Sequence, residues 1–365
     1  MSKKVIISGG GTGGHIFPAI AIANALRERM PDIDLLFVGA CGKMEMEKVP
    51  AAGYKIIGLP VAGFQRKLTT KNVTFFFKLA SSLVKARRIL KRFNPDVAVG
   101  VGGYASGPIL RMASWEGVPI LLQEQNSFAG VTNRLLGQKA SSICVAYENM
   151  DRFFDARKIK LTGNPVRQDI LKTIDKVDAR KELGLLPNKK TILIVGGSLG
   201  ARTINQAIAQ GLVLYAKSDV QVIWQTGKIY FSDMVKLKSQ IEAPNVHVFE
   251  FVSRMDLAYA ASDVVVSRAG AGTISELCLL GKPSILVPSP NVSEDHQTKN
   301  AMALVQKNAA VLVKDTDAKQ NLVSLSIELV CSSEKCTALS EAISSMALHQ
   351  SAQRIADEIF SLIKN

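Results

Sequence analysis

A histidine that directly follows a glycine-rich turn is the residue of this chain best suited to chemistry. His15 ends the segment GGGTGGH at residues 9–15, which comes straight after the apolar run VIIS. The spacing Gly9-x-Gly11-x-x-Gly14 fits the turn that binds a dinucleotide between a strand and a helix. A well-placed histidine can also take a proton in a reaction and speed that step about 10²- to 10⁴-fold. The segment thus predicts either a cofactor site or a reaction site.

The next apolar run argues against a nicotinamide cofactor. A dinucleotide site usually has an acidic residue at the end of the second strand, about 20 residues past the turn, where it binds the ribose. Here that strand, DLLFVGACGK, ends at Gly39 without an acid, and Asp34 lies at its beginning. A better candidate for a ribose is Glu276, which follows another turn by a few residues. We expect it on the first turn of a helix, where its carboxylate could accept two hydrogen bonds from a cis-diol. Alternatively, Glu276 only complements the dipole of its helix.

Glycine-rich turns recur along the chain, and each follows a predicted strand. They are GGGTGGH at 9–15, GVGGYASGP at 100–108, GGSLGAR at 196–202 and RAGAGTISE at 268–276. In such a turn the backbone N–H groups can approach an anion closely, and the start of the next helix adds partial positive charge. A doubly wound sheet binds its ligands at the carboxyl ends of its strands. The turns therefore predict a site for phosphate or pyrophosphate.

Short apolar runs alternate with helical stretches such as AIAIANALRERM and INQAIAQGLVLYAK along nearly the whole chain. Unbroken runs rich in β-branched residues are typical of parallel strands that are covered on both faces, and their order implies right-handed βαβ units. We expect an α/β fold with two Rossmann-like, doubly wound parallel sheets. The predicted strands are VIIS, DLLFVG, KIIGLPV, VAVGVG, PILLQE, SICVA and IKLTG in the first half, and TILIVGG, VQVIWQTG, VHVFEFV, DVVVSRAG, PSILVPS and AAVLV in the second.

The two halves restart in the same way, which predicts two domains with a cleft between them. VIISGGGTGGH opens the first half and TILIVGGSLGAR opens the second. The segment GNPVRQDI lies between them and suits a linker, because its Asn-Pro pair disfavours a helix. We place the domains at 1–163 and 164–348. The last segment, 349–365, is predicted to form an amphipathic helix that packs on either domain, with the first as our assignment.

The composition is that of a globular protein kept in the cytosol. Of the 365 residues, 47% are hydrophobic and 21% charged. The five scattered cysteines contain no C-x-x-C pair, which indicates free thiols in a reducing compartment. No stretch approaches the ~18 apolar residues that would span a bilayer, and the apolar run at the start is too short for a signal peptide.

The net charge of +14 arises mainly from one segment. Residues 64–92 contain nine basic side chains and no acidic one. A helix is predicted from about Lys71, with Lys71, Lys78, Lys85 and Arg92 in one stripe. This face is either an ordinary solvated surface or a docking surface for anionic membrane lipid, with Phe75–Phe77 at the interface. Nucleic acid is not expected, because neither a stacking platform nor a recognition-helix motif accompanies the charge.

Seven blocks of this sequence resemble the MurG family in content and order. They are GGGTGGHIFPA, GVGGYASGP, QEQNSFAGVTN, GNPVR, GGSLGA, SRAGAGTISEL and EDHQTKNA, and the similarity runs from Val5 to about Ala310. Members of this family are glycosyltransferases of peptidoglycan synthesis. They move N-acetylglucosamine from UDP-N-acetylglucosamine to the 4-hydroxyl of undecaprenyl-linked muramyl-pentapeptide, with inversion, and turn lipid I into lipid II. The resemblance implies a GT-B architecture and a peripheral enzyme on the cytoplasmic face of the inner membrane. Alternatively, the chain is a related GT-B glycolipid glycosyltransferase, or a nucleotide-sugar-binding protein without turnover.

The resemblance also implies roles for individual residues. On the donor side, Glu276 would hold the uridine ribose, Ser198 and the Ala271–Thr273 turn would lie near the diphosphate, and Gln297 would contact the sugar. The full donor set is Thr12, Gly13, Gly14, Asn126, Arg167, Ser198, Val252, Ala271, Gly272, Thr273, Glu276 and Gln297. The acceptor set is Gly11, Gly14, Gly103, Tyr104 and Ser106.

His15 is the predicted catalytic base. Of the four histidines, His247 lies within a predicted strand and His349 lies in the part without a matching block, whereas His15 begins a helix directly after a glycine turn. Alternatively, His15 orients an acceptor group or the start of the helix, and a carboxylate or water takes the proton.

No cofactor is expected, and no metal site. The two Asp-x-Asp pairs, at 32–34 and 315–317, match the motif that holds a divalent metal in many glycosyltransferases, but such short pairs often arise by chance. No His/Cys cluster has ligand spacing. The leaving diphosphate is then expected to be stabilised by backbone amides and helix N-termini at the GGSLGA and AGAGT turns.

Overall fold

The computed structural model describes residues 2–61 and 71–363, and for 71–76 and 293 it describes the backbone alone. The chain forms two compact units. The first contains residues 1–166 together with 348–365, and the second contains residues 167–347. The sequence places the boundaries after 163 and after 348, and the cleft between the domains stays a prediction.

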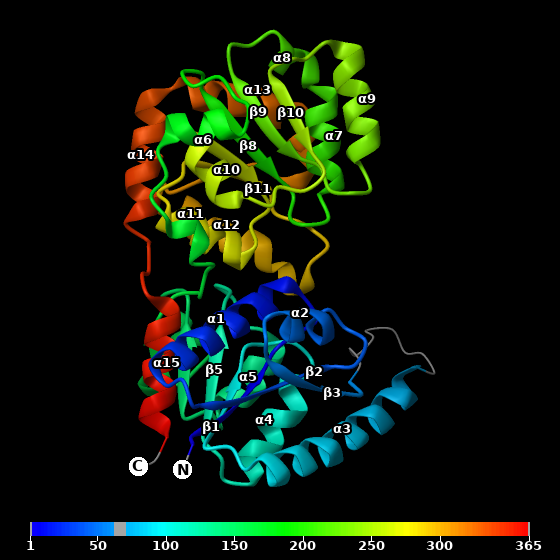
Figure 1. The fold of residues 1–365 in the computed structure, drawn as a ribbon, viewed down its shortest axis with the longest axis vertical. Coiled ribbons are helices and arrows are strands. Elements are labelled where there is room, and N and C mark those ends of the chain that lie inside the picture. Colours follow the sequence, from blue (N-terminus) through cyan, green and yellow to red (C-terminus); the bar gives the residue numbers. More distant parts are fainter. Residues whose placement is uncertain (1, 62–70, 364–365) are drawn as a thin grey trace. The chain divides into compact units, whose positions relative to one another are not determined.

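The first unit is built on a parallel sheet of seven strands (Figure 1). The strand order is β3-β2-β1-β4-β5-β6-β7. The strands are β1 (Lys4–Ser8), β2 (Asp34–Ala40), β3 (Lys55–Leu59), β4 (Val97–Gly100), β5 (Ile120–Glu124), β6 (Ser142–Val145) and β7 (Ile159–Leu161). The helices are α1 (Gly13–Arg29), α2 (Glu45–Ala51), α3 (Lys71–Phe93), α4 (Ser106–Trp115), α5 (Val131–Gly137) and α15 (Ser351–Leu362).

Helices cover both faces of this sheet, and the alternation along β1 shows why. Val5 and Ile7 point to one face and pack with α1 and α15, whereas Ile6 points to the other and packs with α3 and α4. All three side chains are fully buried. A strand buried on both faces needs an unbroken apolar run, which is what VIIS supplies.

The second unit repeats this plan with a parallel sheet of six strands in the order β10-β9-β8-β11-β12-β13 (Figure 1). The strands are β8 (Thr191–Val195), β9 (Gln221–Gln225), β10 (Val246–Phe249), β11 (Val264–Ser267), β12 (Ser284–Leu286) and β13 (Val311–Leu312). The helices are α6 (Lys176–Glu182), α7 (Arg202–Gln210), α8 (Leu212–Ala216), α9 (Phe231–Ile241), α10 (Met255–Ala261), α11 (Ala271–Leu279), α12 (His296–Val305), α13 (Ala318–Cys331) and α14 (Ser333–Ser344).

Every predicted strand is present, and the prediction of two doubly wound parallel sheets is confirmed. The predicted helical stretch INQAIAQGLVLYAK is helical, but Gly211 divides it into two helices, α7 and α8. Gly211 lies against α13, where an added Cβ would come within 2.6 Å of a Val323 methyl group. The break lets the chain pass close to α13.

The four glycine-rich turns lie where the strand order reverses. In the first unit the order reverses between β1 and β4, and in the second between β8 and β11. These four strands are the ones that lead into the turns GGGTGGH, GVGGYASGP, GGSLGAR and RAGAGTISE. In an open α/β sheet the crevice at this reversal is the usual ligand site.

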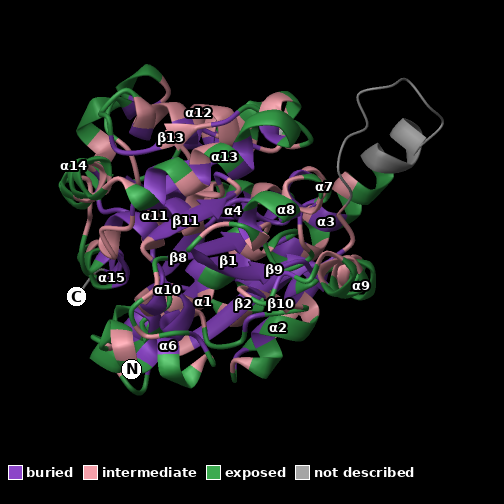
Figure 2. Ribbon diagram, turned by 90° about the horizontal axis from the view of Figure 1, so that it is seen from above, coloured by how far each residue is buried: buried purple, intermediate pink, exposed green. Residues whose placement is uncertain are grey.

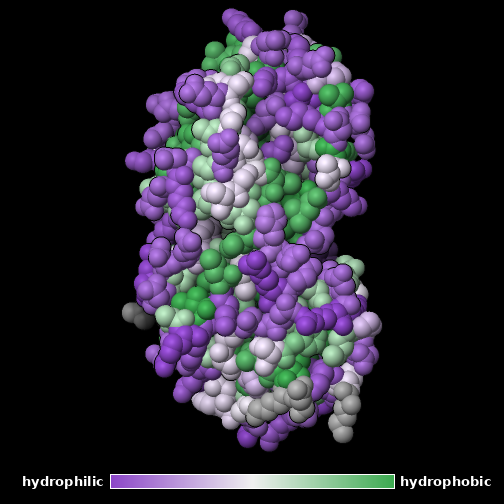
Figure 3. Space-filling view, turned by 90° about the vertical axis from the view of Figure 1, so that its left-hand side faces the viewer, coloured by the Kyte–Doolittle hydropathy of each residue, from purple (hydrophilic) through white to green (hydrophobic). Residues whose placement is uncertain are grey.

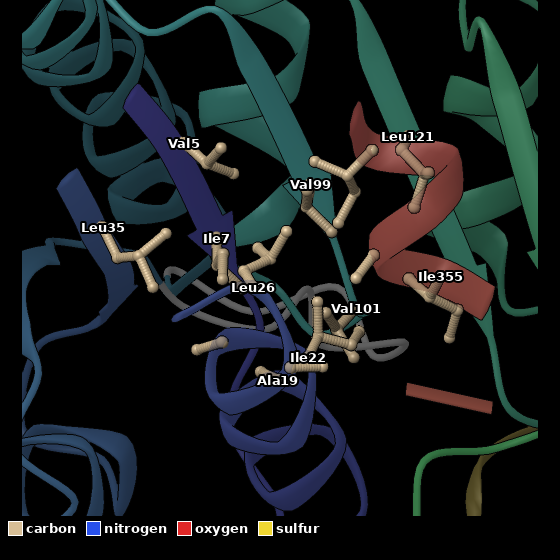
Figure 4. Packing of buried hydrophobic residues seen from close by; sticks show 14 of the residues in the cluster. Val5, Ile7, Ala19, Ile22, Leu26, Leu35, Val99, Val101, Leu121 and Ile355 are labelled. Carbon is tan, nitrogen blue, oxygen red and sulfur yellow. The ribbon is translucent and has the colours of Figure 1, made fainter. Parts of the chain in front are cut away.

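The last helix of the chain completes the core of the first unit. Ile355 and Ile359 of α15 are fully buried in the same apolar cluster as Val5 and Ile22. Figure 4 shows Ile355 beside the side chains of α1 and of the central strands. The sequence leaves open on which domain this helix packs. In the structure it packs on the first unit, as assigned.

Buried and exposed residues follow the layers of each unit. Figure 2 shows that the central strands are buried, while exposed residues lie on the outer sides of the helices. On the face in Figure 3, hydrophilic residues cover most of the surface, with smaller hydrophobic areas between them. Within the described ranges, no helix has both the length and the apolarity needed to cross a membrane.

Candidate active site

The His15 ring is held by the glycine turn that precedes it. Its Nδ1 lies 3.1 Å from the carbonyl oxygen of Gly10 and 3.3 Å from the Thr12 hydroxyl. A carbonyl oxygen can only accept, so Nδ1 must carry the hydrogen in this contact. In the neutral ring the other nitrogen, Nε2, then has the lone pair that can take a proton. The geometry thus fits a general base, and it also fits a ring that only orients a neighbouring group.

The second turn of the first unit packs against this histidine. An added Cβ at Gly102 would lie 2.7 Å from His15 Cδ2 and 2.8 Å from Nε2. At Gly103 it would collide with the carbonyl oxygen of Gly10. Both glycines have positive φ, 96° and 89°, a conformation that other residues rarely adopt. Gly102, which the sequence analysis did not single out, is needed for the ring to lie where it does.

The predicted acceptor residues near this turn divide into exposed and buried ones. The Tyr104 side chain is 58% exposed, and Gly11 and Gly14 are exposed as well. Ser106 is fully buried, and its hydroxyl lies 2.9 Å from the carbonyl oxygens of both Ser8 and Gly102, which share its single hydrogen. Its side chain therefore fixes the two turns relative to each other.

A buried carboxylate that sequence reasoning missed also holds the first turn. Glu45, at the start of α2, is fully buried. One of its oxygens accepts the Ala40 N–H and the other accepts the Gly11 N–H, both at 2.9 Å. An added Cβ at Gly10 or Gly39 would collide with this side chain. A dinucleotide site usually has an acid near the end of the second strand to bind a ribose. Glu45 lies five residues beyond Ala40, but it binds the backbone of the first glycine turn instead.

A second buried acid, Glu124, shapes the loop that contains the predicted donor residue Asn126. One oxygen of Glu124 accepts the backbone and side-chain N–H groups of Asn126, at 3.1 and 3.2 Å. The other accepts Gly130 N–H and the Asn133 amide, at 3.0 and 2.8 Å. The QEQN loop is therefore built around the Glu124 carboxylate.

Glu276, the predicted ribose-binding residue, lies in a polar cluster of the second unit. It sits in the second turn of α11, one turn later than predicted. Its Oε2 accepts a 2.8 Å hydrogen bond from the Tyr259 hydroxyl, and its Oε1 lies 3.4 Å from Arg167 Nε. The structure thus brings two predicted donor residues, Arg167 and Glu276, together. Tyr259 is the third member, which sequence reasoning missed.

Burial changes the acid–base behaviour of this cluster. Burial raises the pKa of the Glu276 carboxyl, and the nearby charge of Arg167 and the Tyr259 hydrogen bond oppose that change. The pKa of Tyr259 is raised by burial too, and by the negative charge of Glu276. Within an apolar surrounding, hydrogen-bond donors are what keep a carboxylate charged.

One buried glutamine joins two predicted donor segments. Gln225 Nε2 donates to the Gly197 carbonyl oxygen in the GGSLGA turn at 3.0 Å, and its Oε1 accepts the Val252 N–H at 2.9 Å. Ser198 is exposed in that turn. Because the Val252 N–H is engaged by Gln225, a ligand at Val252 would meet the carbonyl group instead.

The remaining predicted donor residues lie at two helix starts. Ala271, Gly272 and Thr273 form the first turn of α11, whose backbone N–H groups have no partner within the helix. An added Cβ at Gly272 would meet nothing within 4 Å. Gln297 lies at the start of α12, where its Oε1 accepts the Ser289 N–H at 2.8 Å.

The Asp315 carboxylate of the second Asp-x-Asp pair is engaged within the second unit. One oxygen accepts from Arg268, which leads into the AGAGT turn, and the other accepts from the Thr203 hydroxyl at 2.9 Å. Thr203 follows the GGSLGAR turn, and Arg268 begins the RAGAGTISE turn. The aspartate therefore ties the two turns of this unit together. Across the described part of the chain, no three or more His, Cys, Asp or Glu side chains are grouped so that they could hold a metal ion.

The comparisons with known proteins agree with this architecture. The model of the glycosyltransferase family 28 N-terminal domain matches residues 5–145, and that of the C-terminal domain matches residues 191–359. These matches, together with the two-unit fold, place the chain in the class of two-domain glycosyltransferases.

Relatives at high identity narrow this class to one family. A UDP-N-acetylglucosamine–N-acetylmuramyl-(pentapeptide) pyrophosphoryl-undecaprenol N-acetylglucosamine transferase of Parabacteroides distasonis is 59% identical over 361 residues, which is 99% of this chain and 98% of the relative. The Bacteroides fragilis protein of the same name is 59% identical over 362 residues, 98% of this chain and 95% of the relative. The chain belongs to the MurG family.

Solved structures support the fold. The crystal structure of Acinetobacter baumannii MurG is similar with a TM-score of 0.77 at 27% identity, and the match covers 98% of this chain and 99% of that one. A calicheamicin glycosyltransferase, at 14% identity, has a TM-score of 0.70 over 99% and 98% of the chains and shares the fold. So does a UDP-N-acetylglucosamine 2-epimerase, at 15% identity and a TM-score of 0.65 over 99% and 96%.

The Tyr259–Glu276 contact predicts how Glu276 titrates. Replacing Tyr259 by phenylalanine removes a donor that stabilises the charged carboxylate, so the already raised pKa of Glu276 should rise further. On acidification, Glu276 would then become neutral at a higher pH than in the unmodified protein. A carbon-13 NMR titration of the glutamate carboxyls measures this.

Tyr215→Phe is the matched control. Tyr215 is another buried tyrosine of the second unit, and its hydroxyl pairs with Ser326. It should leave the Glu276 titration unchanged. An unchanged or lowered Glu276 pKa in Tyr259→Phe would contradict the assignment.

Proposed function

We propose that this chain transfers N-acetylglucosamine from UDP-N-acetylglucosamine to the 4-hydroxyl of undecaprenyl-pyrophosphoryl-N-acetylmuramyl-pentapeptide, turning lipid I into lipid II with inversion at the sugar. The observation that carries the proposal is 59% identity over nearly the whole chain to transferases named for these substrates. The glycine turns at both strand-order reversals support it, because both substrates contain a diphosphate.

On the donor side, we propose that the second unit holds UDP-N-acetylglucosamine. The Glu276 carboxylate accepts hydrogen bonds from the ribose hydroxyls, and Tyr259 and Arg167 hold this carboxylate in place. The diphosphate lies at the start of α11 and at the turn around Ser198, whose backbone N–H groups suit an anion. Gln297 and Val252 contact the sugar and the uracil.

On the acceptor side, we propose that His15 is the base. The 4-hydroxyl gives its proton to Nε2 as its oxygen attacks the anomeric carbon, and UDP leaves with the electron pair of the broken bond. The support is the Nδ1 contact to Gly10, which leaves Nε2 to accept. Thr12, Gly13 and Gly14 line this site, with Asn126 at the sugar, and Tyr104 and Gly103 contact the acceptor.

We infer that the charge on the leaving diphosphate is stabilised without a metal. Backbone N–H groups and helix starts are fixed donors that need no rearrangement as the charge develops. In the second unit, such groups are present at the GGSLGA and AGAGT turns. The Asp315 carboxylate already pairs with Arg268, which leads into the AGAGT turn, and with Thr203, which follows the GGSLGA turn.

We also propose that α3 docks on anionic lipid at the cytoplasmic face of the membrane, where a lipid-linked acceptor is held. The prediction of a helix from Lys71 is confirmed. One face of α3 packs on the unit through Ala86 and Leu90, while Phe77 is 75% exposed and Lys78, Lys91 and Arg92 are exposed. An exposed aromatic ring amid basic groups suits a lipid headgroup layer. Residues 64–70 and the side chains of 71–76 lie outside the described part.

Two substitutions should separate chemistry from donor binding. His15→Ala should lower kcat at least about 100-fold and leave the UDP-N-acetylglucosamine Kd nearly unchanged, because it removes the base. Glu276→Gln should raise that Kd about 10- to 100-fold, because it removes a charged acceptor. UDP release with a lipid I analogue gives kcat, and calorimetry gives Kd. A kcat within about threefold of the unmodified enzyme in His15→Ala would contradict the base assignment.

Removal of divalent metal should not affect the reaction. With excess EDTA, we expect the rate of sugar transfer to stay within about twofold, since fixed amides stabilise the leaving group. Added magnesium or manganese should not raise it. Loss of activity in EDTA that either metal restores would overturn the metal-free mechanism.

Removing charge from α3 should weaken membrane binding. The protein should bind vesicles with phosphatidylglycerol more tightly than neutral phosphatidylcholine vesicles. Lys78→Gln with Arg92→Gln should weaken binding to the anionic vesicles by about 1 kcal/mol per charge, roughly fivefold each. Lys236→Gln with Lys319→Gln, which removes two exposed charges from the second unit, is the control. Equal loss in both pairs, or equal binding to both vesicles, would contradict the proposal.

A further inference from the structure

One peptide group of the first turn connects the His15 ring to a buried acid. The carbonyl of this group, Gly10 C=O, lies 3.1 Å from His15 Nδ1. Its N–H, which belongs to Gly11, donates to Glu45 Oε2 at 2.9 Å. The carboxylate, the peptide and the imidazole therefore form a chain of two hydrogen bonds in which all donors point toward the carboxylate.

The carboxylate at the end of this chain is rigidly placed. Glu45 is fully buried, and its second oxygen accepts the Ala40 N–H at 2.9 Å. Two backbone donors, one in the turn after β1 and the other at the last residue of β2, thus hold the two oxygens. The absence of side chains at Gly10 and Gly39 leaves the space that the glutamate fills. A protonated carboxyl would satisfy these donors less well, since it would itself carry a donor.

We propose that Glu45 is a positioning residue for His15 that acts through the Gly10–Gly11 peptide. The proposal rests on the proposed role of His15 as the base. A carboxylate that accepts a hydrogen bond from a peptide N–H polarises that peptide group. The carbonyl oxygen of the same peptide then becomes a stronger acceptor. That oxygen holds the hydrogen on Nδ1, so Nε2 keeps the lone pair.

The chain of bonds also stabilises the charged ring that the reaction forms. When Nε2 takes the proton of the sugar hydroxyl, the ring becomes a cation, and its Nδ1–H remains bonded to Gly10 C=O. No proton moves to Glu45. The carboxylate plays the part that an aspartate plays in a Ser-His-Asp triad, where the acid fixes the ring and stabilises its charge. Here one peptide group separates the acid from the ring.

The test is Glu45→Gln in the full-length enzyme, with two readouts. A glutamine of nearly the same shape has one acceptor atom for the two N–H groups and no charge. We expect kcat to fall at least about tenfold, because part of the rate gain from a well-positioned base is lost. The KM for UDP-N-acetylglucosamine should stay within about twofold of its original value. Nitrogen-15 NMR of labelled histidine should show His15 with its hydrogen on Nδ1 in the unmodified enzyme, and a mixture of both tautomers in the variant.

Glu47→Gln is the matched control. Glu47 lies two residues further along α2, is exposed and pairs with Lys48. It should change neither kcat nor the histidine spectrum. Of the four histidine signals, the one missing in His15→Ala belongs to His15.

The outcomes separate this inference from the proposed function. If His15→Ala loses activity but Glu45→Gln keeps its kcat within twofold and its His15 tautomer, the base stands and the positioning role is overturned. If His15→Ala keeps activity, the proposed base fails, and the tautomer in Glu45→Gln alone decides whether Glu45 controls the ring. If Glu45→Gln does not fold, a hydrogen on Nε2 in the unmodified enzyme would still overturn the inference, and one on Nδ1 would support it.

Discussion

Backbones in this protein approach one another so closely at the ends of the central strands that no side chain fits between them. In the first unit, a side chain at Gly103 would collide with the Gly10 carbonyl group. In the second, one at Gly200 would collide with the Thr226 carbonyl group. These contacts place turns from separate strands side by side, so that backbone N–H groups of the two turns lie close together. The acceptor and donor sites that we propose depend on this constraint.

The acids near these turns are used to hold the protein together as much as to meet ligands. Glu45 accepts two backbone N–H groups, and Asp315 accepts from Arg268 and Thr203. A buried charge is costly unless donors surround it, and here the donors belong to the segments that need fixing. Burial raises the pKa of the Glu276 carboxyl, although Arg167 and Tyr259 oppose that change. Its environment therefore suits a further hydrogen-bond donor, such as a ribose hydroxyl.

The first unit needs both ends of the chain. Its central strand β1 begins at Lys4, and its core is closed by α15, which ends at Leu362. Ile355 and Ile359 contribute two fully buried side chains to the cluster around Val5 and Ile22. Truncating a buried isoleucine typically costs about 2–5 kcal/mol, so this helix is part of the unit rather than an appendage. The core of the unit that carries His15 therefore includes α15.

The sequence by itself determined the order and type of the strands, because each run of β-branched residues has the length and apolarity of a strand buried on both faces. It also located the glycine turns, since their spacing is a local property. It did not indicate the break at Gly211, where the chain packs closely against Val323 of α13, a helix far away in the sequence.

Only the tertiary structure decided which side chains meet at the turns. Glu45 is far in the chain from Gly11, and Gln225 is far from Gly197, yet a hydrogen bond joins each pair. Tyr259 is likewise far from Arg167, and both contact Glu276. Nothing in the local pattern distinguishes a buried glutamate from an exposed one such as Glu47 on the same short helix. The packing of β2 and α2 against the first turn makes that distinction, because it brings one carboxylate within reach of two backbone N–H groups and leaves the other in solvent.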